Sequence, residues 1–151
     1  MGQYFTNDEN LKSEYRNIIY KYKDLTLNFT SDLGVFSKDR VDFASKLLLE
    51  TYFENGKKNI NVLDVGCGYG FIGVTLSKIM NSYVDMIDVN KRAVHLSNIN
   101  IKNNNVNANA FISNIYENIE KKYDCIITKS AYKSWKKCLY EYNRKCSRVF
   151  N

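Results

Sequence analysis

The sequence of 151 residues contains no proline and a single histidine, His95, and none of its cysteines forms a Cys-x-x-Cys pair. A structural zinc site normally needs several cysteine or histidine ligands at short spacings. We therefore expect no metal site, and thiols that stay reduced in a cytoplasmic setting. The four cysteines stand far apart in the chain, at Cys67, Cys125, Cys138 and Cys146.

Long apolar runs are also absent. No stretch approaches the roughly 18 apolar residues of a membrane span. The start of the chain lacks the apolar stretch behind a basic end that marks a secretory signal. Hydrophobic residues make up 44% and charged residues 25% of a chain long enough for one domain. We expect a globular cytoplasmic protein that does not enter a membrane.

The formal net charge is +6, and all of that excess lies in the last part of the chain. Residues 129–151 carry seven lysines and arginines against one glutamate, whereas residues 1–128 carry equal numbers of basic and acidic residues. A basic balance suggests nucleic acid as a partner, here only for the tail. We therefore divide the chain into a domain at 1–128 and an atypical basic tail at 129–151.

Hydrophobic periodicity predicts strands that alternate with helices. Residues 17–30 alternate polar and apolar about a Lys-Asp turn, which indicates a β-hairpin with one apolar face. A helix is expected to start at residues 37–40, with apolar residues at Val41, Phe43, Ala44, Leu47 and Leu48. The core at about 59–128 is predicted to hold strands at 59–65, 83–89, 109–112 and 123–128, and helices at 71–80 and 91–103. This order predicts an α/β fold with a parallel sheet and right-handed crossovers.

In such sheets, ligands bind beyond the carboxyl ends of the strands, where the strand order reverses. The predicted strand ends carry a glycine-rich loop and several polar residues, at 64–70, Asp88, Asn114 and Thr128. Because these ends meet at one edge of a parallel sheet, their convergence predicts a binding site there.

The loop itself favours a methionine-containing cofactor over a dinucleotide. Gly66, Gly68 and Gly70 allow positive φ and a close approach of the backbone to a ligand. A dinucleotide site has the pattern Gly-x-Gly-x-x-Gly, and with Phe71 after Gly70 the third glycine is misplaced. Asp64, just before the loop, would repel a pyrophosphate but suits an ammonium group. A nicotinamide-dependent oxidoreductase is therefore the weaker hypothesis, and a tight turn without a ligand is the alternative to both.

A second carboxylate, Asp88, follows Gly66 by 22 residues and ends the next predicted strand. At that place a carboxylate can accept hydrogen bonds from both hydroxyls of a ribose. The alternative is a solvated carboxylate at a strand end.

Several motifs together resemble the small-subunit ribosomal RNA guanine-N2 methyltransferases, a family of class I S-adenosylmethionine methyltransferases. Residues 62–70 (VLDVGCGYG) match the family's glycine-rich motif, and further matches lie at 4–7, 12–14, 32–42 and 113–117. The resemblance covers residues 3 to about 128. It implies a Rossmann-like sheet, incomplete at its C-terminal side, that binds S-adenosylmethionine. The residues that it implies at the cofactor are Asp64, Gly66, Cys67, Gly68, Gly70, Asp88, Val89, Asn114 and Ile115.

Two of the matched segments leave room for interpretation. Asn114 stands where the family commonly has aspartate, and its carbonyl oxygen can still accept from the adenine amine. Phe36 and Ser37 either close over the cofactor or pack in a loop before the helix.

The resemblance breaks after Thr128, where the family continues with Asn-Pro-Pro-x-Arg and this chain has Lys129, Ser130 and Ala131. The family's asparagine and proline carbonyl would hold the target amine in line with the methyl group. A lysine ammonium is only a donor, so no catalytic residue is secure at this place. Deletion of one base from the Lys129 codon, with suitable synonymous codons downstream, would restore the motif.

We therefore expect a frameshifted tail and a truncated sheet. An ordinary basic helix, with Trp135, Leu139 and Tyr142 packing inward, is the alternative for the tail. A truncated sheet would leave its fourth strand as an exposed edge, prone to self-association.

The function implied by these observations is methyl transfer from S-adenosylmethionine to a guanine exocyclic amine in ribosomal RNA, with little activity expected in this chain. A non-catalytic cofactor-binding remnant, or a module that binds RNA through its basic tail, is the alternative.

Overall fold

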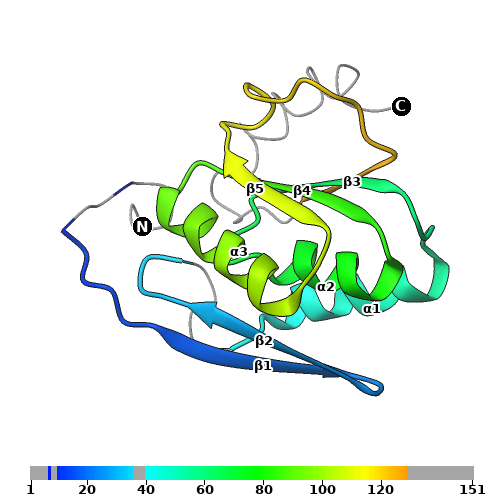
Figure 1. Cartoon of the computed structure of the whole chain (residues 1–151), viewed down its shortest axis with the longest axis horizontal. Coiled ribbons are helices and arrows are strands. Elements are labelled where there is room, and N and C mark those ends of the chain that lie inside the picture. The colour runs from blue at the N-terminus through cyan, green and yellow to red at the C-terminus, as the bar shows by residue number, and fades with distance from the viewer. Residues whose placement is uncertain (1–6, 8–9, 36–39, 129–151) are drawn as a thin grey trace.

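The structure, a computed structural model, describes residues 7, 10–35 and 40–128. These residues form a two-stranded antiparallel hairpin and a four-stranded parallel sheet, with helices layered between them (Figure 1). Residues 129–151 lie outside the described part, and so do Phe36 and Ser37.

The hairpin consists of β1 (Arg16–Tyr22) and β2 (Leu25–Ser31). Ile18 pairs with Phe29 and Tyr20 with Leu27, and all four side chains are buried. Alternation of side chains along a strand places them on one face. This face packs against the helix layer, where the Phe71 ring lies 5.4 Å from that of Phe29 and 5.1 Å from that of Tyr20. The predicted hairpin at 17–30 is confirmed.

The parallel sheet has the strand order β5-β4-β3-β6. The chain therefore crosses from β3 to β5 in one direction and returns to the other side of β3 for β6, which confirms the predicted α/β fold. The strands of this sheet are β3 (Asn61–Val65), β4 (Tyr83–Asp88), β5 (Ala108–Ile112) and β6 (Cys125–Thr128), and the crossover helices are α2 (Phe71–Met80) and α3 (Lys91–Asn104).

Two asparagines of α3 join the hairpin to the helix layer. The carboxamide of Asn100 accepts from the N–H of Thr30 (2.7 Å) and donates to its carbonyl (2.9 Å). Asn104 does the same for Asn28, at 3.1 and 2.8 Å. Four residues of helix rise about 6 Å and two residues of strand about 6.7 Å, so the two carboxamides match the strand spacing. The two carboxamides therefore bind backbone groups of β2 that a neighbouring strand would otherwise bind.

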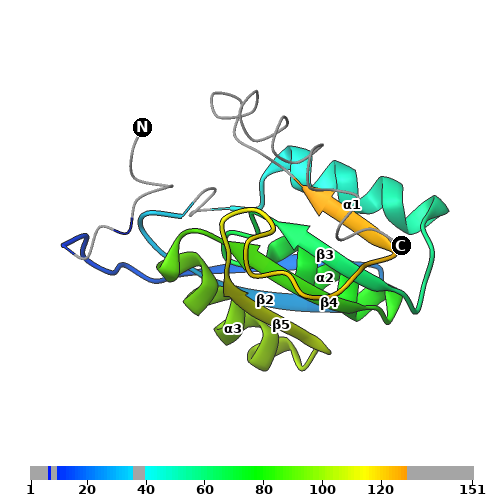
Figure 2. The same cartoon turned by 90° about the horizontal axis from the view of Figure 1, so that it is seen from above.

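The first helix, α1 (Phe43–Asn55), begins later than predicted. Its N-cap is Asp42, whose Oδ2 accepts from the Ser45 N–H at 2.9 Å, so the expected start at 37–40 is wrong. The predicted apolar set is confirmed in part: Val41 and Leu48 pack half-buried against the core, whereas Phe43 is 77% and Leu47 55% exposed. The reason is position: α1 lies at the side of the helix layer (Figure 2), where it meets α2 and also strand β1 of the hairpin, through Glu50 and Phe53.

The face of the sheet away from the helices is covered by the connection 113–124, with Tyr116 and Tyr123 packed on Leu63 and Ile87. A buried carboxylate anchors this connection. Asp85 accepts from the hydroxyl of Tyr123 at 2.6 Å and pairs with Lys121 at 2.7 Å.

Candidate cofactor site

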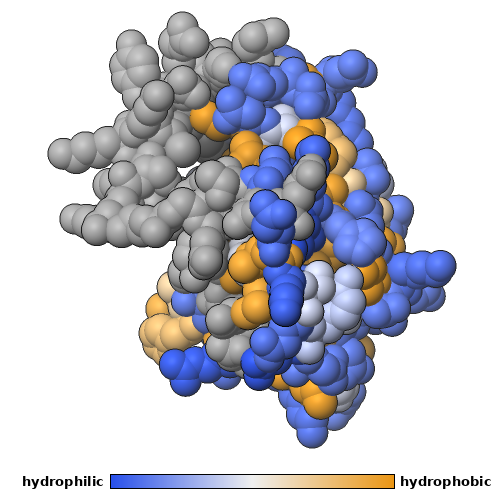
Figure 3. Space-filling model, turned by 90° about the vertical axis from the view of Figure 1, so that its left-hand side faces the viewer, coloured by the Kyte–Doolittle hydropathy of each residue, from blue (hydrophilic) through white to orange (hydrophobic). Residues whose placement is uncertain are grey.

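The four parallel strands end at the same side of the sheet, where β5 ends and α3 begins. Three chain segments meet there: the glycine-rich loop after β3, Asp88 at the end of β4, and Ser113 and Asn114 after β5. The Ser113 N–H donates to the carbonyl of Asp88 at 3.1 Å, so the last two segments adjoin directly. Figure 3 views the molecule from this side, where hydrophobic patches lie among hydrophilic surface.

The loop after β3 bends back over the end of β4. The N–H groups of Gly66 and Cys67 both donate to the carbonyl of Ile87, at 2.8 and 3.0 Å. Gly66, Gly68 and Gly70 all have positive φ, at 77°, 58° and 93°. A Cβ on Gly68 would meet no atom within 4 Å, so its backbone faces open space where a ligand can approach. The sequence correctly predicted that these glycines take positive φ.

Asp64 lies beneath this loop and is 1% exposed. Its Oδ2 accepts from the N–H of Gly73, in the first turn of α2, at 3.1 Å. Burial raises the pKa of Asp64 to about 7, the hydrogen bond from Gly73 opposes that rise, and the charge of Asp88 adds to it. The carboxylate therefore occupies the N-terminal end of α2, which is where a dinucleotide fold binds its pyrophosphate.

Asp88 is half-buried and bound through both oxygens. Its Oδ2 accepts from the Gly68 N–H and its Oδ1 from the Asn90 N–H, each at 2.9 Å. Burial raises its pKa, while these two N–H groups oppose the rise. A carboxylate has about four acceptor positions, so each oxygen can still accept from a hydroxyl group. The hydrogen bond to Gly68 brings the two predicted carboxylates to the same loop.

The residues predicted near an adenine ring follow these strand ends. Asn114 is exposed, and its amide donates to Glu117 Oε1 at 3.1 Å. Ile115 has a φ of 53° and packs half-buried against the cluster on the far face of the sheet. Val89 directly follows Asp88 and is half-buried. The structure brings all three to the edge that holds Asp88, and their contact with a cofactor stays a prediction.

Cys67 is a buried thiol inside the loop, 3.4 Å from the hydroxyl of Ser97. Burial raises its pKa well above the usual value, and nearby Asp88 and Asp64 raise it further. It is therefore suited to packing rather than to nucleophilic attack. Cys125 is also a free thiol, whereas Cys138 and Cys146 lie outside the described residues.

Sequence reasoning missed the role of Gly73. Counted from Gly68 rather than Gly66, the loop does contain Gly-x-Gly-x-x-Gly, ending at Gly73, so the argument from a misplaced third glycine is wrong. A Cβ on Gly73 would lie 2.3 Å from the sulfur of Met86, so this glycine lets α2 pack closely on β4. The sequence argument against a dinucleotide therefore depends on Asp64 alone, because its charge would repel a pyrophosphate. The signal that could have revealed the role of Gly73 was its spacing of three residues from Gly70.

Among the described residues, no three histidine, cysteine, aspartate or glutamate side chains group as metal ligands would. None of the described helices is long and apolar enough to cross a membrane. What the edge does offer is open backbone at Gly68, two carboxylates whose pKa values are raised by burial, and a sheet whose strand order reverses at β3. These features fit a nucleoside that carries a cationic amino acid, and the strand order is that of the Rossmann-like fold on which class I methyltransferases are built.

Comparison with known proteins gives the family. Residues 26–140 match the methyltransferase small domain, and the chain belongs to this family. YbxB of Bacillus subtilis is 37% identical over 141 residues, which cover 91% of this chain and 70% of that protein. The ribosomal RNA small subunit methyltransferase C of Photorhabdus laumondii is 36% identical over 100 residues, and these span 66% of this chain but only 29% of that protein.

A solved structure shows the same similarity. The T. thermophilus 16S rRNA N2 G1207 methyltransferase (RsmC), in complex with AdoMet and guanosine, matches with a TM-score of 0.73 and 28% identity. The match covers 80% of this chain and 34% of that one. M. jannaschii TYW2 in complex with AdoMet, at 20% identity and a TM-score of 0.66, supports the fold alone.

Proposed function

We propose that this chain binds S-adenosylmethionine at the carboxyl edge of its parallel sheet and belongs, in its chemistry, to the enzymes that methylate the exocyclic amine of guanine in ribosomal RNA. The observation that carries the proposal is the arrangement of Asp64 and Asp88, each bound to a backbone N–H of the same loop-and-helix unit. The family and the relatives described above support the substrate class. Such a substrate would place the protein in the cytoplasm.

The residues present fit the cofactor's functional groups one by one. Asp88 offers acceptor positions to the ribose hydroxyls, and the backbone of Gly68 leaves space beside them. Asp64 supplies negative charge beneath the loop, which favours an ammonium group by electrostatic attraction. When bound, S-adenosylmethionine supplies an electrophilic methyl group on a sulfonium centre. The protein's part in such a transfer is mostly to hold the target amine in line.

Calorimetric titration with S-adenosylhomocysteine and with NAD tests the cofactor. We expect S-adenosylhomocysteine to bind, NAD to show no measurable binding, and Asp88→Ala to bind S-adenosylhomocysteine much more weakly. Preference for NAD would overturn the proposal. Incubation of ribosomal RNA with tritiated S-adenosylmethionine, followed by nucleoside analysis for N2-methylguanosine, tests the reaction.

One observation favours a second candidate, a cofactor-binding protein with slow or no methyl transfer. Thr128 lies beside Val65, with its hydroxyl 3.3 Å from that carbonyl, so the chain leaves β6 at the edge of the cofactor site. The next residue is Lys129, where the family's asparagine is expected, and a lysine ammonium cannot accept from a guanine amine. Cofactor binding without N2-methylguanosine would favour this candidate.

The basic residues at 129–151 give that candidate a role in binding RNA. If they bind phosphates, the affinity for RNA falls steeply with salt. A full-length variant with Lys136→Glu and Lys137→Glu should then bind RNA more weakly and with a smaller salt dependence, without a change in affinity for S-adenosylhomocysteine.

A further inference from the structure

The start of α3 directly follows Asp88, and two asparagines from distant parts of the chain share its cap. Asn90 accepts through its side chain from the N–H groups of Arg92 (2.9 Å) and Ala93 (3.3 Å). The remaining N–H of this turn, that of Lys91, donates to the side-chain oxygen of Asn7 at 2.8 Å. The first N–H groups of a helix have no partner within the helix, so a side chain from elsewhere can bind them.

Asn7 also binds the peptide on the other side of Asn90. Its side-chain amide donates to the carbonyl of Val89 at 3.4 Å. One carboxamide thus binds a carbonyl before Asn90 and an N–H after it. The Asn90 N–H itself donates to Asp88 at 2.9 Å, so the turn 89–91 is held by Asp88 on one side and Asn7 on the other.

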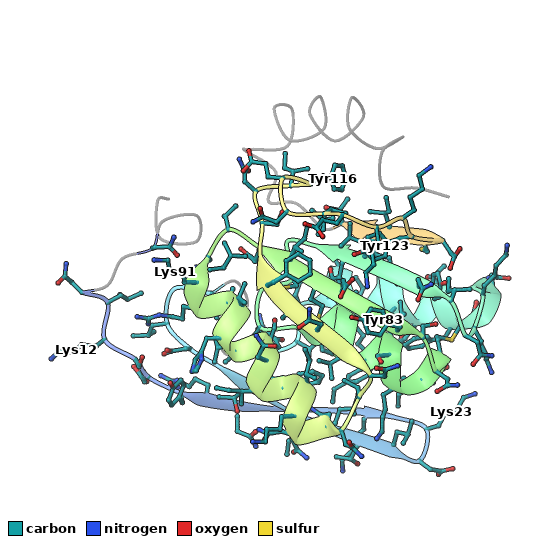
Figure 4. All side chains as sticks on the ribbon, turned by 45° about the horizontal axis from the view of Figure 1, so that its top comes forward. Lys12, Lys23, Tyr83, Lys91, Tyr116 and Tyr123 are labelled. Atoms are coloured by element: carbon teal, nitrogen blue, oxygen red, sulfur yellow. The ribbon has the colours of Figure 1, made fainter. Side chains whose placement is uncertain are left out.

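The chain segment that carries Asn7 is anchored a few residues further on. The Arg92 guanidinium donates to the carbonyls of Leu11 (2.5 Å) and Leu33 (3.0 Å) and pairs with buried Asp32 at 3.3 Å. The Leu11 side chain also packs on Gly34, where an added Cβ would lie 2.7 Å from it. Figure 4 shows Lys12 of this segment and Lys91 of α3 at the same end of the molecule, far from Lys23 at the hairpin turn.

We infer that Asn7 is a positioning residue for the cofactor site, which acts by fixing the turn 89–91 and through it the orientation of Asp88. This inference rests on the proposed function. Without Asn7, the Lys91 N–H loses its acceptor and the turn gains freedom that a bound ribose must remove. The loss therefore falls on ligand affinity, because Asn7 is exposed and contributes little to the core.

The test compares full-length Asn7→Ala and Asn7→Asp with Asn103→Ala, a control at an exposed asparagine of α3. Titration calorimetry with S-adenosylhomocysteine is paired with thermal unfolding of the free protein. We expect Asn7→Ala to bind about tenfold more weakly, with an unfolding midpoint that stays within about 1 °C of the wild type. Asn7→Asp keeps the acceptor for Lys91 and should retain most of the affinity, and Asn103→Ala should retain all of it.

The inference is overturned if wild type binds the ligand and Asn7→Ala binds equally well, or if Asn103→Ala weakens binding as much. A lower unfolding midpoint in Asn7→Ala, without a change in affinity, overturns it as well, because that result assigns Asn7 to stability alone. If the wild type does not bind S-adenosylhomocysteine, the proposed function itself fails, which is a different result.

Discussion

The carboxylate of Asp88 accepts a hydrogen bond of 2.9 Å from the backbone N–H of Gly68, and this bond joins the end of β4 to the glycine-rich loop after β3. The two segments are 20 residues apart in the chain and belong to different strands of the sheet. This side chain therefore fixes the loop at Gly68, where an added Cβ would meet no atom within 4 Å.

Replacement of Asp88 should weaken cofactor binding. We expect Asp88→Ala to weaken binding of S-adenosylhomocysteine by about a hundredfold, because the ribose hydroxyls lose two hydrogen bonds to a charged acceptor. Asp88→Asn keeps one acceptor oxygen and should lose about tenfold. Asp24→Ala, at the hairpin turn, is the control for calorimetric titration. Equal affinity in Asp88→Ala and the control would exclude this site.

The raised pKa of Asp64 predicts that binding depends on pH. Only the ionised carboxylate attracts an ammonium group, so affinity for S-adenosylhomocysteine should rise as the pH increases from about 5.5 to about 8. Binding near pH 7 should release a proton, detectable by calorimetry in buffers of different ionisation enthalpy. Asp64→Asn should remove the proton release and reduce the pH dependence, of which Asp88, whose pKa burial also raises, keeps a share. An unchanged pH dependence in this variant would contradict the assignment.

The raised pKa of Asp64 also makes the free energy of unfolding of the free protein depend on pH, in the direction opposite to that of ligand affinity. A carboxyl whose pKa rises from 3.8 to about 7 on folding binds its proton more tightly in the folded state. The contribution of Asp64 to the free energy of unfolding therefore falls as the pH increases from about 4 to about 7, and is constant above that range. Urea unfolding across this range should show a smaller decline for Asp64→Asn than for the wild type.

The close packing of Gly73 on Met86 predicts that a larger residue at position 73 destabilises the protein. In Gly73→Ala the new methyl group would meet Met86, so we expect a loss of about 1–3 kcal/mol in the free energy of unfolding. Truncation in Met86→Ala makes room for that methyl group. The double variant should therefore lose less than the sum of the two single variants, measured by urea unfolding. Strict additivity would show that the two residues do not conflict.

The hydrogen bonds between α3 and the hairpin predict that replacement of Asn100 destabilises the protein. Asn100→Ala loses hydrogen bonds to both backbone groups of Thr30 and to the carbonyl of Tyr69. We expect a destabilisation of about 2–3 kcal/mol, against less than about 0.5 kcal/mol for exposed Asn103→Ala. Equal values for the two variants in chemical denaturation would disprove a role in docking.

We also propose that β6 makes this chain prone to self-association. Among the described residues, β6 pairs with β3 on one side only, and unpaired strand edges bind further strands. Sedimentation equilibrium should show mass increasing with concentration, and amide exchange of 125–128 should slow in parallel. A single monomer at all concentrations would refute this proposal.

The sequence was sufficient for the order of elements and for the edge of the sheet at which Asp64 and Asp88 meet. Periods of two and of about 3.6 residues are local properties, so the hairpin and the alternating strands and helices followed from them. The carboxyl ends of parallel strands must share an edge, which placed Asp64 and Asp88 together before any coordinates. The boundaries of α2 were also predicted correctly, because glycine and asparagine flank its apolar run.

The exposed face of α1 could not be predicted in the same way. Phe43 and Leu47 have helical spacing, but spacing only says that they share a side of the helix. Which side is buried depends on what lies beside the helix, and α1 packs on α2 and on strand β1, which leaves Phe43 and Leu47 exposed. The start of α1 could not be predicted either, since the Asp42 side chain caps the helix through the Ser45 N–H.

The sequence alone therefore determined the class of fold and which loop and carboxylates meet at one edge of the sheet, because both follow from local spacing and from the geometry common to all parallel sheets. Only the tertiary structure decided the partners: Asp64 with Gly73, Asn100 with Thr30, and Asn7 with the start of α3. A hydrogen bond needs two groups within about 3 Å. For residues up to 84 positions apart, that distance is set by packing and not by sequence spacing.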